Sequence, residues 1–288
     1  MSWLLLSLLA ALTLATNDAL TKKFFSGLTS LEMGLVRLLY SLPWLALSLL
    51  WIPRPELDRT FWIAVAVALP LELAAVLAYM KALKSSPLSL SLPFLAFTPL
   101  FILLTGWFIL GEKITPAGLG GIALIVIGSY GLNLSQAGQG WGGPFRAVFK
   151  EPGSRLMLLV ALIYAFTSAL GKLAVLHSHP FFFPLLYYLL LGAGLVLFLP
   201  FNRSARASRL FEKPLPGLLI GILGAVSVCS HMLAISQIQA AYMISVKRTS
   251  LLFAVLYGAL WFKEEHIGER LLGTALMVSG VFLIGWQG

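Results

Sequence analysis

The chain has 288 residues, of which 59% are hydrophobic and only 11% are charged, and its formal net charge is +9. Soluble domains carry about 25% charged residues, so this composition excludes a water-soluble globular protein and predicts an integral membrane protein. The positive charge does not indicate nucleic-acid binding, because the basic residues gather in short loops between apolar runs and form no basic helix with interleaved aromatic residues.

The first apolar run is WLLLSLLAALTLATNDALTKKF, which starts at Trp3. It lacks a basic leader and shows no small-residue cleavage site, so we expect a retained membrane span and not a signal peptide. Cys229 is the single cysteine, which excludes an internal disulfide and a multi-cysteine metal site. We therefore expect neither a metal nor a cofactor.

Ten apolar runs are long enough to be membrane-spanning helices, because about 20 helical residues cross a hydrocarbon core of roughly 30 Å. Lipid cannot satisfy free backbone groups, and these runs are too long and too uniformly apolar for barrel strands. In chain order we expect helices at residues 3–21, 30–51, 61–83, 87–110, 116–134, 154–175, 181–200, 215–238, 240–262 and 267–286. Pro93 and Pro99 should bend or break the fourth.

The two halves of the chain resemble each other. ALTLATNDALTK, from Ala11, and ALIYAFTSALGK, from Ala161, share six of twelve residues at an offset of 150. GIALIVIG, from Gly121, and GTALMVSG, from Gly273, share five of eight at an offset of 152. Similar offsets in separate helices indicate a duplicated unit.

The duplication predicts a first five-helix repeat at 1–134, a glycine-rich linker at 135–155 and a second repeat at 156–288. Because five is an odd number, the second repeat must enter the membrane from the opposite side. We therefore expect an all-α protein built as a 5+5 inverted repeat around a central cavity, which is an arrangement that transporters use. A duplication that only builds a larger bundle is the alternative.

A glutamate ends the fourth run and the ninth run, in ILGEK at 109–113 and WFKEE at 261–265, and a helix rich in small residues follows each. With the ten short helices and the duplication, these features resemble the EamA-type branch of the drug/metabolite transporter superfamily. The resemblance implies a central cavity and alternating access without ATP. It also implies that both termini are cytoplasmic, whereas the Lys and Arg residues of the loops favour the opposite orientation.

Lys247 and Arg248 interrupt the ninth apolar run. If a helix began after them, LLFAVLYGALWF would span about 18 Å, which is too short to cross. The pair must therefore lie within the membrane, where a cation costs at least about 2.5–3.5 kcal/mol. Three features could offset this cost: snorkelling, pairing with Asp18 or Glu72, or a watery cavity that holds an anionic substrate.

The offset of 152 aligns Lys247 with Leu95 and Arg248 with Ala96, so these charges occur in one half only. Charges that folding requires should recur in both halves, which favours a substrate role for the pair.

The dipeptide Lys247-Arg248 is also similar to the phosphate-binding pair of plastid sugar-phosphate transporters. Those proteins add a lysine in the fourth span, which this chain lacks. The resemblance therefore implies recognition of an anion but not of phosphate in particular.

Other polar residues of the spans are candidates for the same cavity. His231 is either a packed histidine or a proton-handling or substrate-binding group. Glu72 and Asp18 are the candidate ion-coupling residues, and pairing with the basic residues is the alternative role. The remaining candidate substrate-binding residues are Asn17, Tyr79, Tyr242 and Ser250.

These observations predict a secondary transporter that moves a small organic metabolite with an anionic group. A proton-coupled exporter of amino acids or amphipathic amines is the alternative. An enzyme is not expected, because HExxH, GxSxG and GxGD-type patterns do not occur in the sequence. We expect a multi-pass monomer or weak dimer in the inner or plasma membrane, with the substrate, lipid and protons as its partners.

Overall fold

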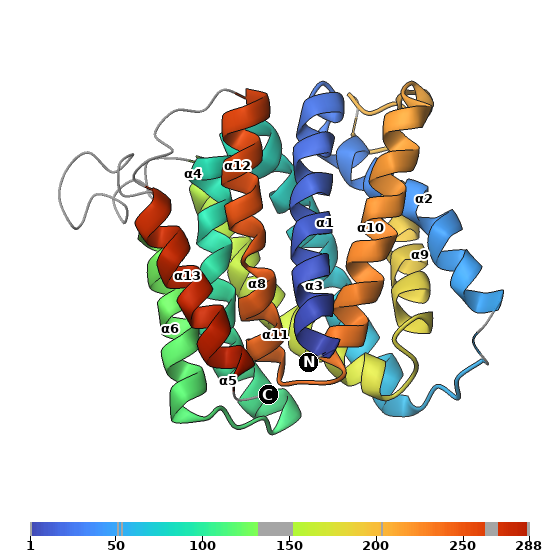
Figure 1. The fold of residues 1–288 in the computed structure, drawn as a ribbon. Coiled ribbons are helices and arrows are strands. Elements are labelled where there is room, and N and C mark those ends of the chain that lie inside the picture. The colour runs from blue at the N-terminus through green and yellow to red at the C-terminus, as the bar shows by residue number, and fades with distance from the viewer. Residues whose placement is uncertain are drawn as a thin grey trace.

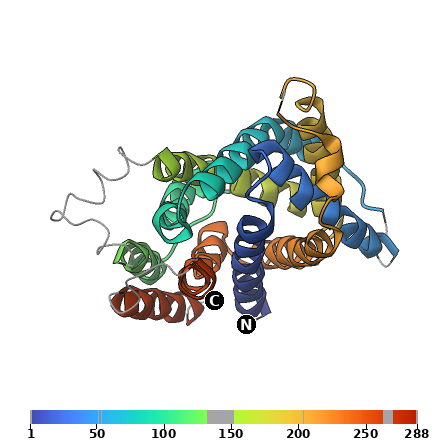
Figure 2. The same cartoon turned by 90° about the horizontal axis from the view of Figure 1, so that it is seen from above.

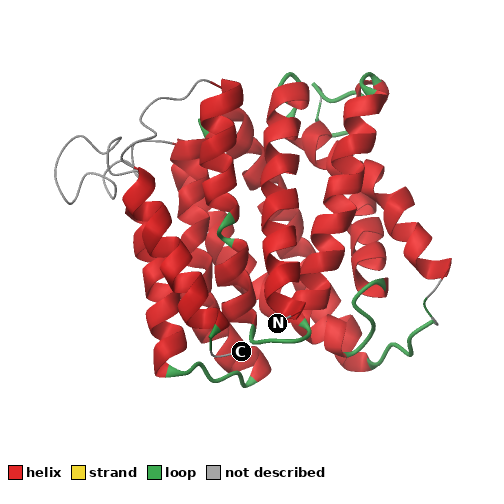
Figure 3. Cartoon of the chain, viewed as in Figure 1, coloured by secondary structure: helices red, strands yellow, loops and turns green. Residues whose placement is uncertain are grey.

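The computed structural model describes residues 2–50, 52, 54–131, 152–202, 204–262 and 270–286, and these form helices joined by loops, with no strand among them (Figure 3). Three 3-10 segments are η1 (Ser48–Leu50), η2 (Leu92–Phe97) and η4 (Ala207–Phe211). The α-helices are α1 (Ser2–Phe25), α2 (Ser30–Leu47), α3 (Arg59–Ser85), α4 (Leu88–Ser91), α5 (Thr98–Leu110), α6 (Pro116–Gly131), α8 (Pro152–Leu176), α9 (Phe182–Leu197), α10 (Pro214–Ile235), α11 (Ala240–Lys247), α12 (Ser250–Phe262) and α13 (Arg270–Gly285).

Within the described ranges, six helical segments are long and apolar enough to cross a membrane, and four more are apolar but shorter. The shorter ones are Phe94–Leu110, Pro116–Gly128, Phe182–Leu197 and Ala275–Ile284. Together they match the ten runs expected from the sequence, and the all-helical prediction is confirmed. The expected linker at 135–155 lies almost wholly outside the described residues, between the end of α6 and the start of α8.

The fourth apolar run is broken, as its prolines predict, into α4, η2 and α5. The ninth run was expected to be one helix, but it too is broken, at Arg248 and Thr249 between α11 and α12. The two breaks correspond in the sequence. The first pieces begin at 88 and 240, the second pieces begin at 98 and 250 and end at 110 and 262, an offset of 152 in each case.

The helices pack in two layers (Figures 1 and 2). One layer contains α13, α12, α1 and α10, and α3 and α8 pack against each other behind it. At one edge α6 and α13 pack so closely that a Cβ added at Gly128 would lie 2.6 Å from the carbonyl oxygen of Gly273. Small residues let membrane helices approach this closely, and van der Waals packing then holds them together.

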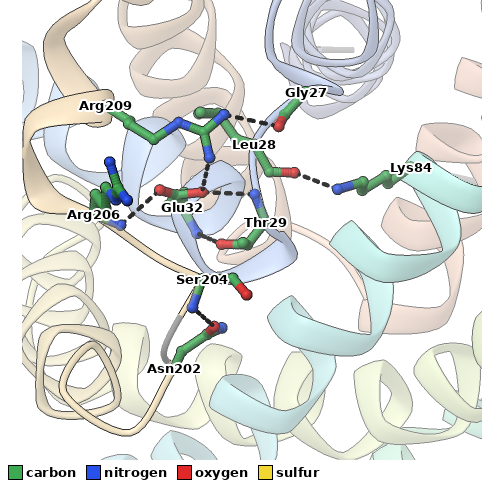
Figure 4. A network of polar contacts seen from close by, with 9 residues as sticks. All are labelled: Gly27, Leu28, Thr29, Glu32, Lys84, Asn202, Ser204, Arg206 and Arg209. Atoms are coloured by element: carbon green, nitrogen blue, oxygen red, sulfur yellow. Dashed lines mark hydrogen bonds and ion pairs between the residues drawn. The ribbon is translucent and has the colours of Figure 1, made fainter.

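Both termini lie at the same end of the bundle (Figure 1), and a buried carboxylate organises the other end (Figure 4). Glu32 completes a capping box with Thr29 at the start of α2 and also accepts a hydrogen bond of 2.8 Å from the Arg206 amide. Arg209 lies 3.5 Å from Glu32, and Lys84 donates to a carbonyl of the α1–α2 turn. The α9–α10 loop and the end of α3 are thereby fastened to the α1–α2 turn.

Asp58 begins α3 at the end that carries the termini. Its side chain accepts a hydrogen bond of 2.8 Å from the Phe61 amide and lies 2.7 Å from Nδ1 of His177. The amide, and after it the histidine, lower the pKa of Asp58. The loops before α3 and before α9 therefore meet at this end of the bundle.

Two glycines provide a matched test of the packing. A Cβ at Gly221 in α10 would lie 2.0 Å from the Tyr40 carbonyl oxygen, whereas one at Gly192 in α9 would meet nothing within 4 Å. Gly221→Ala should lower the free energy of unfolding by about 1–3 kcal/mol through overpacking. Gly192→Ala should leave it unchanged or raise it by up to about 1 kcal/mol, because alanine is the better helix former. Unfolding in detergent, followed by circular dichroism, measures both; equal losses in the two variants would contradict the packing described.

Candidate functional site

A cavity of about 200 Å³ lies inside the bundle and is lined by residues of α1, α2, α3, α8, α9, α10 and α11 and by Arg248. Most small-molecule sites are larger, about 300–1,000 Å³, so the space suits a small ligand. Its ionisable lining residues, tyrosines apart, are Arg37, Glu72, Lys172, His231, Lys247 and Arg248. Its tyrosines are Tyr79, Tyr164, Tyr187 and Tyr188.

Arg248 stands at the break in the ninth run, where it is the C-cap of α11. Its amide closes the last turn of α11, and the partial negative charge of a helix C-terminus favours a cation there. The side chain is 4% exposed, and Nη2 donates a hydrogen bond of 2.8 Å to Oγ1 of Thr98, the first residue of α5. The guanidinium thus joins the two broken runs, while its Nε has no hydrogen-bond partner among the described residues.

Lys247 and His231 form a direct pair, with 2.6 Å between Nζ and Nδ1. An ammonium can only donate, so Nδ1 accepts and a neutral ring must carry its proton on Nε2. The Glu72 carboxyl group interacts electrostatically with the Thr167 hydroxyl, the Lys247 ammonium and the tyrosines Tyr164, Tyr187 and Tyr188. Three candidates from the sequence, Glu72, His231 and Lys247, therefore lie in the lining of the same cavity.

Arg37 in α2 belongs to a second polar group of the cavity lining. Its Nη1 donates a hydrogen bond of 2.6 Å to Oδ1 of Asp18, and the Tyr79 hydroxyl donates one of 2.5 Å to Oδ2. The Arg37 guanidinium also lies 5.8 Å from the centre of the Tyr79 ring. Asp18 does not itself line the cavity but stands behind Arg37 and Tyr79 and neutralises the cation.

Lys172 is a cavity-lining cation with two partners. Its Nζ donates to Oε1 of Glu112 at 2.5 Å and to the carbonyl of Ile238 at 2.6 Å, and Oε2 of Glu112 accepts from the Ala240 amide at 2.9 Å. The lysine therefore ties α8 to the end of α5 and the start of α11.

A corresponding bond occurs in the first half of the chain. Lys22, 150 residues before Lys172, donates to the carbonyl of Ser86, which is 152 residues before Ile238. Glu264, which aligns with Glu112, lies outside the described residues.

The comparisons with known proteins bear on the whole chain. The family model of EamA-like transporters matches residues 1–134 and 152–286. The chain belongs to the EamA-like transporter family. A solved structure described as "Crystal structure of protein" has a TM-score of 0.76 at 16% identity and covers 100% of this chain and 99% of its own, which shows a shared fold alone. No curated protein matches the chain.

Membership of the EamA-like family confirms the resemblance drawn from the sequence. Members of this family are transporters and not enzymes, so the chain is a multi-pass membrane transporter of small molecules.

Three further candidates from the sequence do not line the cavity. Asn17 donates a hydrogen bond of 2.7 Å to the Ile220 carbonyl and so joins α1 to α10. The Tyr242 hydroxyl accepts from the Thr115 amide at 3.1 Å, before the start of α6. Ser250 is the buried first residue of α12. Substrate contact by Asn17, Tyr242 and Ser250 stays a prediction.

Sequence reasoning missed some of the lining residues. Arg37 lies within the second predicted span, at 30–51, so its charge inside an apolar run was the signal that could have found it. Tyr164, Tyr187 and Tyr188 carry no such signal, because aromatic residues are also common where helices meet the membrane surface.

Lys172 provides a stability test. Lys172→Met leaves the largely buried carboxylate of Glu112, which is 11% exposed, without its cation, and removing one partner of a buried ion pair costs about 3–5 kcal/mol. Lys81→Met is the matched control, because Lys81 is exposed in α3. We expect the Lys172 variant alone to lose melting temperature in detergent. A Lys172 variant as stable as the Lys81 variant would show that the ion pair does not support the fold.

Proposed function

We propose that this EamA-family protein is a secondary active transporter that moves a small organic metabolite with an anionic group by alternating access. The observation that carries the proposal is Arg248. It is a buried cation that lines the cavity at the junction of the two broken helical runs, and part of its guanidinium lacks a partner among the described residues. A second cation, Lys247, lines the cavity beside it.

The two basic side chains suit complementary tasks. A guanidinium can hold a carboxylate or phosphate with two parallel hydrogen bonds, whereas an ammonium acts as a point charge. Arg248 would therefore orient the anion and Lys247 would add attraction without fixing its direction. The sequence positions that align with them at an offset of 152 are Leu95 and Ala96, which supports a task beyond the scaffold.

We also propose that the transporter is a 5+5 inverted repeat, with units at 1–134 and 156–288 joined by the linker at 135–155. Support comes from the shared offset of 152 between the broken runs, and from the lysine-to-carbonyl bonds of Lys22 and Lys172. Five spans in each half also account for the two termini at one end of the bundle (Figure 1). Such halves rock about a central site to give access from either side.

The carrier would act as a monomer or weak dimer in the inner or plasma membrane. The match to the EamA-like family supports a multi-pass protein. It also supports transport that is not driven by ATP. The substrate would travel through the cavity between the halves, and lipid would surround the exposed apolar side chains of the outer helices.

Charge removal tests the anion site. A thermal-shift screen of the purified protein with organic anions identifies the strongest ligand, because a ligand that binds the folded state raises its stability. Arg248→Gln and Lys247→Gln should each weaken that ligand about tenfold or more, since a hydrogen bond to a charged group contributes about 1.5–3 kcal/mol. Lys81→Gln, at an exposed position, is the control. Unchanged affinity and unchanged uptake into proteoliposomes in both cavity variants would overturn the proposed site.

The second candidate function is a proton-coupled exporter of amino acids or amphipathic amines. Glu72 favours it, because its carboxyl group lines the cavity and could carry a proton. Asp18 is the less suitable carrier, since Arg37 and Tyr79 already hold both of its oxygens behind the cavity wall.

Glu72→Gln tests the role of Glu72 as the proton carrier. If Glu72 carries the coupling proton, the variant should lose transport driven by a pH gradient while still exchanging substrate at equilibrium, because glutamine cannot ionise. Proteoliposomes with and without an imposed gradient measure the difference, and Glu56→Gln, at an exposed position before α3, is the control. Gradient-driven transport that survives in Glu72→Gln would exclude this residue as the proton carrier.

A further inference from the structure

We propose that the substrate is a small monocarboxylate that also carries a hydroxyl or carbonyl group, and that Tyr187 recognises this second group. The inference rests on the proposed anion site at Arg248. To that site it adds the number of negative charges on the substrate, a second polar group on the substrate, and the residue that binds this group.

The charges around the cavity leave one positive charge unbalanced. Arg37 is paired with Asp18, and Lys172 is paired with Glu112. The remaining formal charges of the lining are the two cations Lys247 and Arg248 and the single carboxylate Glu72. A net charge is costly in the low-dielectric interior of a membrane protein, so one bound negative charge gives the most favourable balance.

A charge count of this kind discriminates between classes of anion. A phosphate monoester carries about −1.5 to −2 at neutral pH and would reverse the imbalance. A zwitterion brings no net charge and would leave the cation unbalanced. A monocarboxylate removes it, and its two oxygens match the fork of the Arg248 guanidinium.

Two buried hydrogen-bonding groups of the lining have no partner among the described residues: Nε of Arg248 and the hydroxyl of Tyr187. Buried polar groups are almost always paired, and a group left unpaired is costly. A carboxylate held by Arg248 accounts for the first group. In this proposal a second polar atom of the substrate accounts for the Tyr187 hydroxyl.

The position of the Tyr187 hydroxyl is fixed by packing. The ring is 8% exposed and stacks on Phe183 with 5.0 Å between ring centres, and Phe183 in turn packs edge-on against Phe61 at 6.2 Å. A hydroxyl on a fixed ring recognises a partner in one place. A site built to hydrogen-bond such a group rejects the analogue that lacks it far more strongly than an apolar pocket distinguishes one methylene.

The size of the cavity limits the rest of the molecule. About 200 Å³ is less than the range of drug-sized sites, and apolar side chains such as Met80, Phe183 and Met232 form much of its wall. A short carbon skeleton with its two polar groups apart fits these conditions. The chemistry is that of a small hydroxy acid or keto acid.

Matched ligands test the proposal on the purified full-length protein in detergent, by thermal shift and calorimetry. The pairs are propionate with lactate or pyruvate, butyrate with 3-hydroxybutyrate or acetoacetate, and phenylacetate with mandelate or phenylglyoxylate, and the charge controls are succinate and 4-aminobutyrate. We expect at least one hydroxy or keto acid to bind about tenfold or more tightly than its partner without the second polar group. Succinate and 4-aminobutyrate should bind more weakly than that acid.

Tyr187→Phe should abolish the difference in affinity within that pair, called the gap below. It should leave the affinity for the unsubstituted acid unchanged, because the ring and its packing on Phe183 are kept. Tyr40→Phe, outside the cavity lining, should keep the gap. Glu72→Gln raises the positive excess to two and should shift the preference toward succinate. Melting temperatures of the variants without ligand show that all are folded.

The outcomes separate this inference from the proposed function. If anions bind and Arg248→Gln weakens them, but succinate or 4-aminobutyrate binds best, no pair shows a gap, or the gap survives in Tyr187→Phe, then the substrate class is wrong and the anion site stands. If no tested anion binds, or if Arg248→Gln has no effect on binding, both the anion site and the inference are overturned.

Discussion

The break in the ninth helical run at Arg248 is the constraint on which the site depends. A break frees backbone groups that lipid cannot satisfy, so it is tolerated only where protein or a cavity surrounds it. Here the Arg248 amide closes the last turn of α11, and the side chain reaches Thr98 at the corresponding break of the fourth run. A guanidinium at this junction holds two interrupted helices together, and its Nε keeps no hydrogen-bond partner among the described residues.

The pairs around the cavity then determine what that donor can do. Asp18 and Glu112 stand outside the lining and neutralise Arg37 and Lys172, so two of the four basic side chains serve the structure of the wall. Lys247 bonds to a histidine nitrogen and also lies near the Glu72 carboxyl group. Arg248 keeps one atom, Nε, without a hydrogen-bond partner among the described residues.

How much of this could be predicted from the sequence depended on which physical rule applied. The thickness of the membrane determines the length of a span, so the ten helical runs were predictable, and Pro93 made the break of the fourth run predictable as well. No proline marks the break at Arg248, so one continuous helix was expected there. Rotation about a helix axis is not visible in a uniformly apolar run, which is why Asn17, Tyr242 and Ser250 could not be told from lining residues such as Tyr187.

The proposed repeat and the proposed single site place different demands on positions that align at an offset of 152. Lys22 and Lys172 make the same kind of bond to a carbonyl in each half, as a folding requirement should. At the offset of 152, Tyr79 aligns with His231, and both line the cavity, yet one donates to a carboxylate and the other accepts from an ammonium. Packing can be shared by two halves, but a single substrate is asymmetric. The proposed anion site accordingly uses a position where the two halves differ, Arg248 against Ala96.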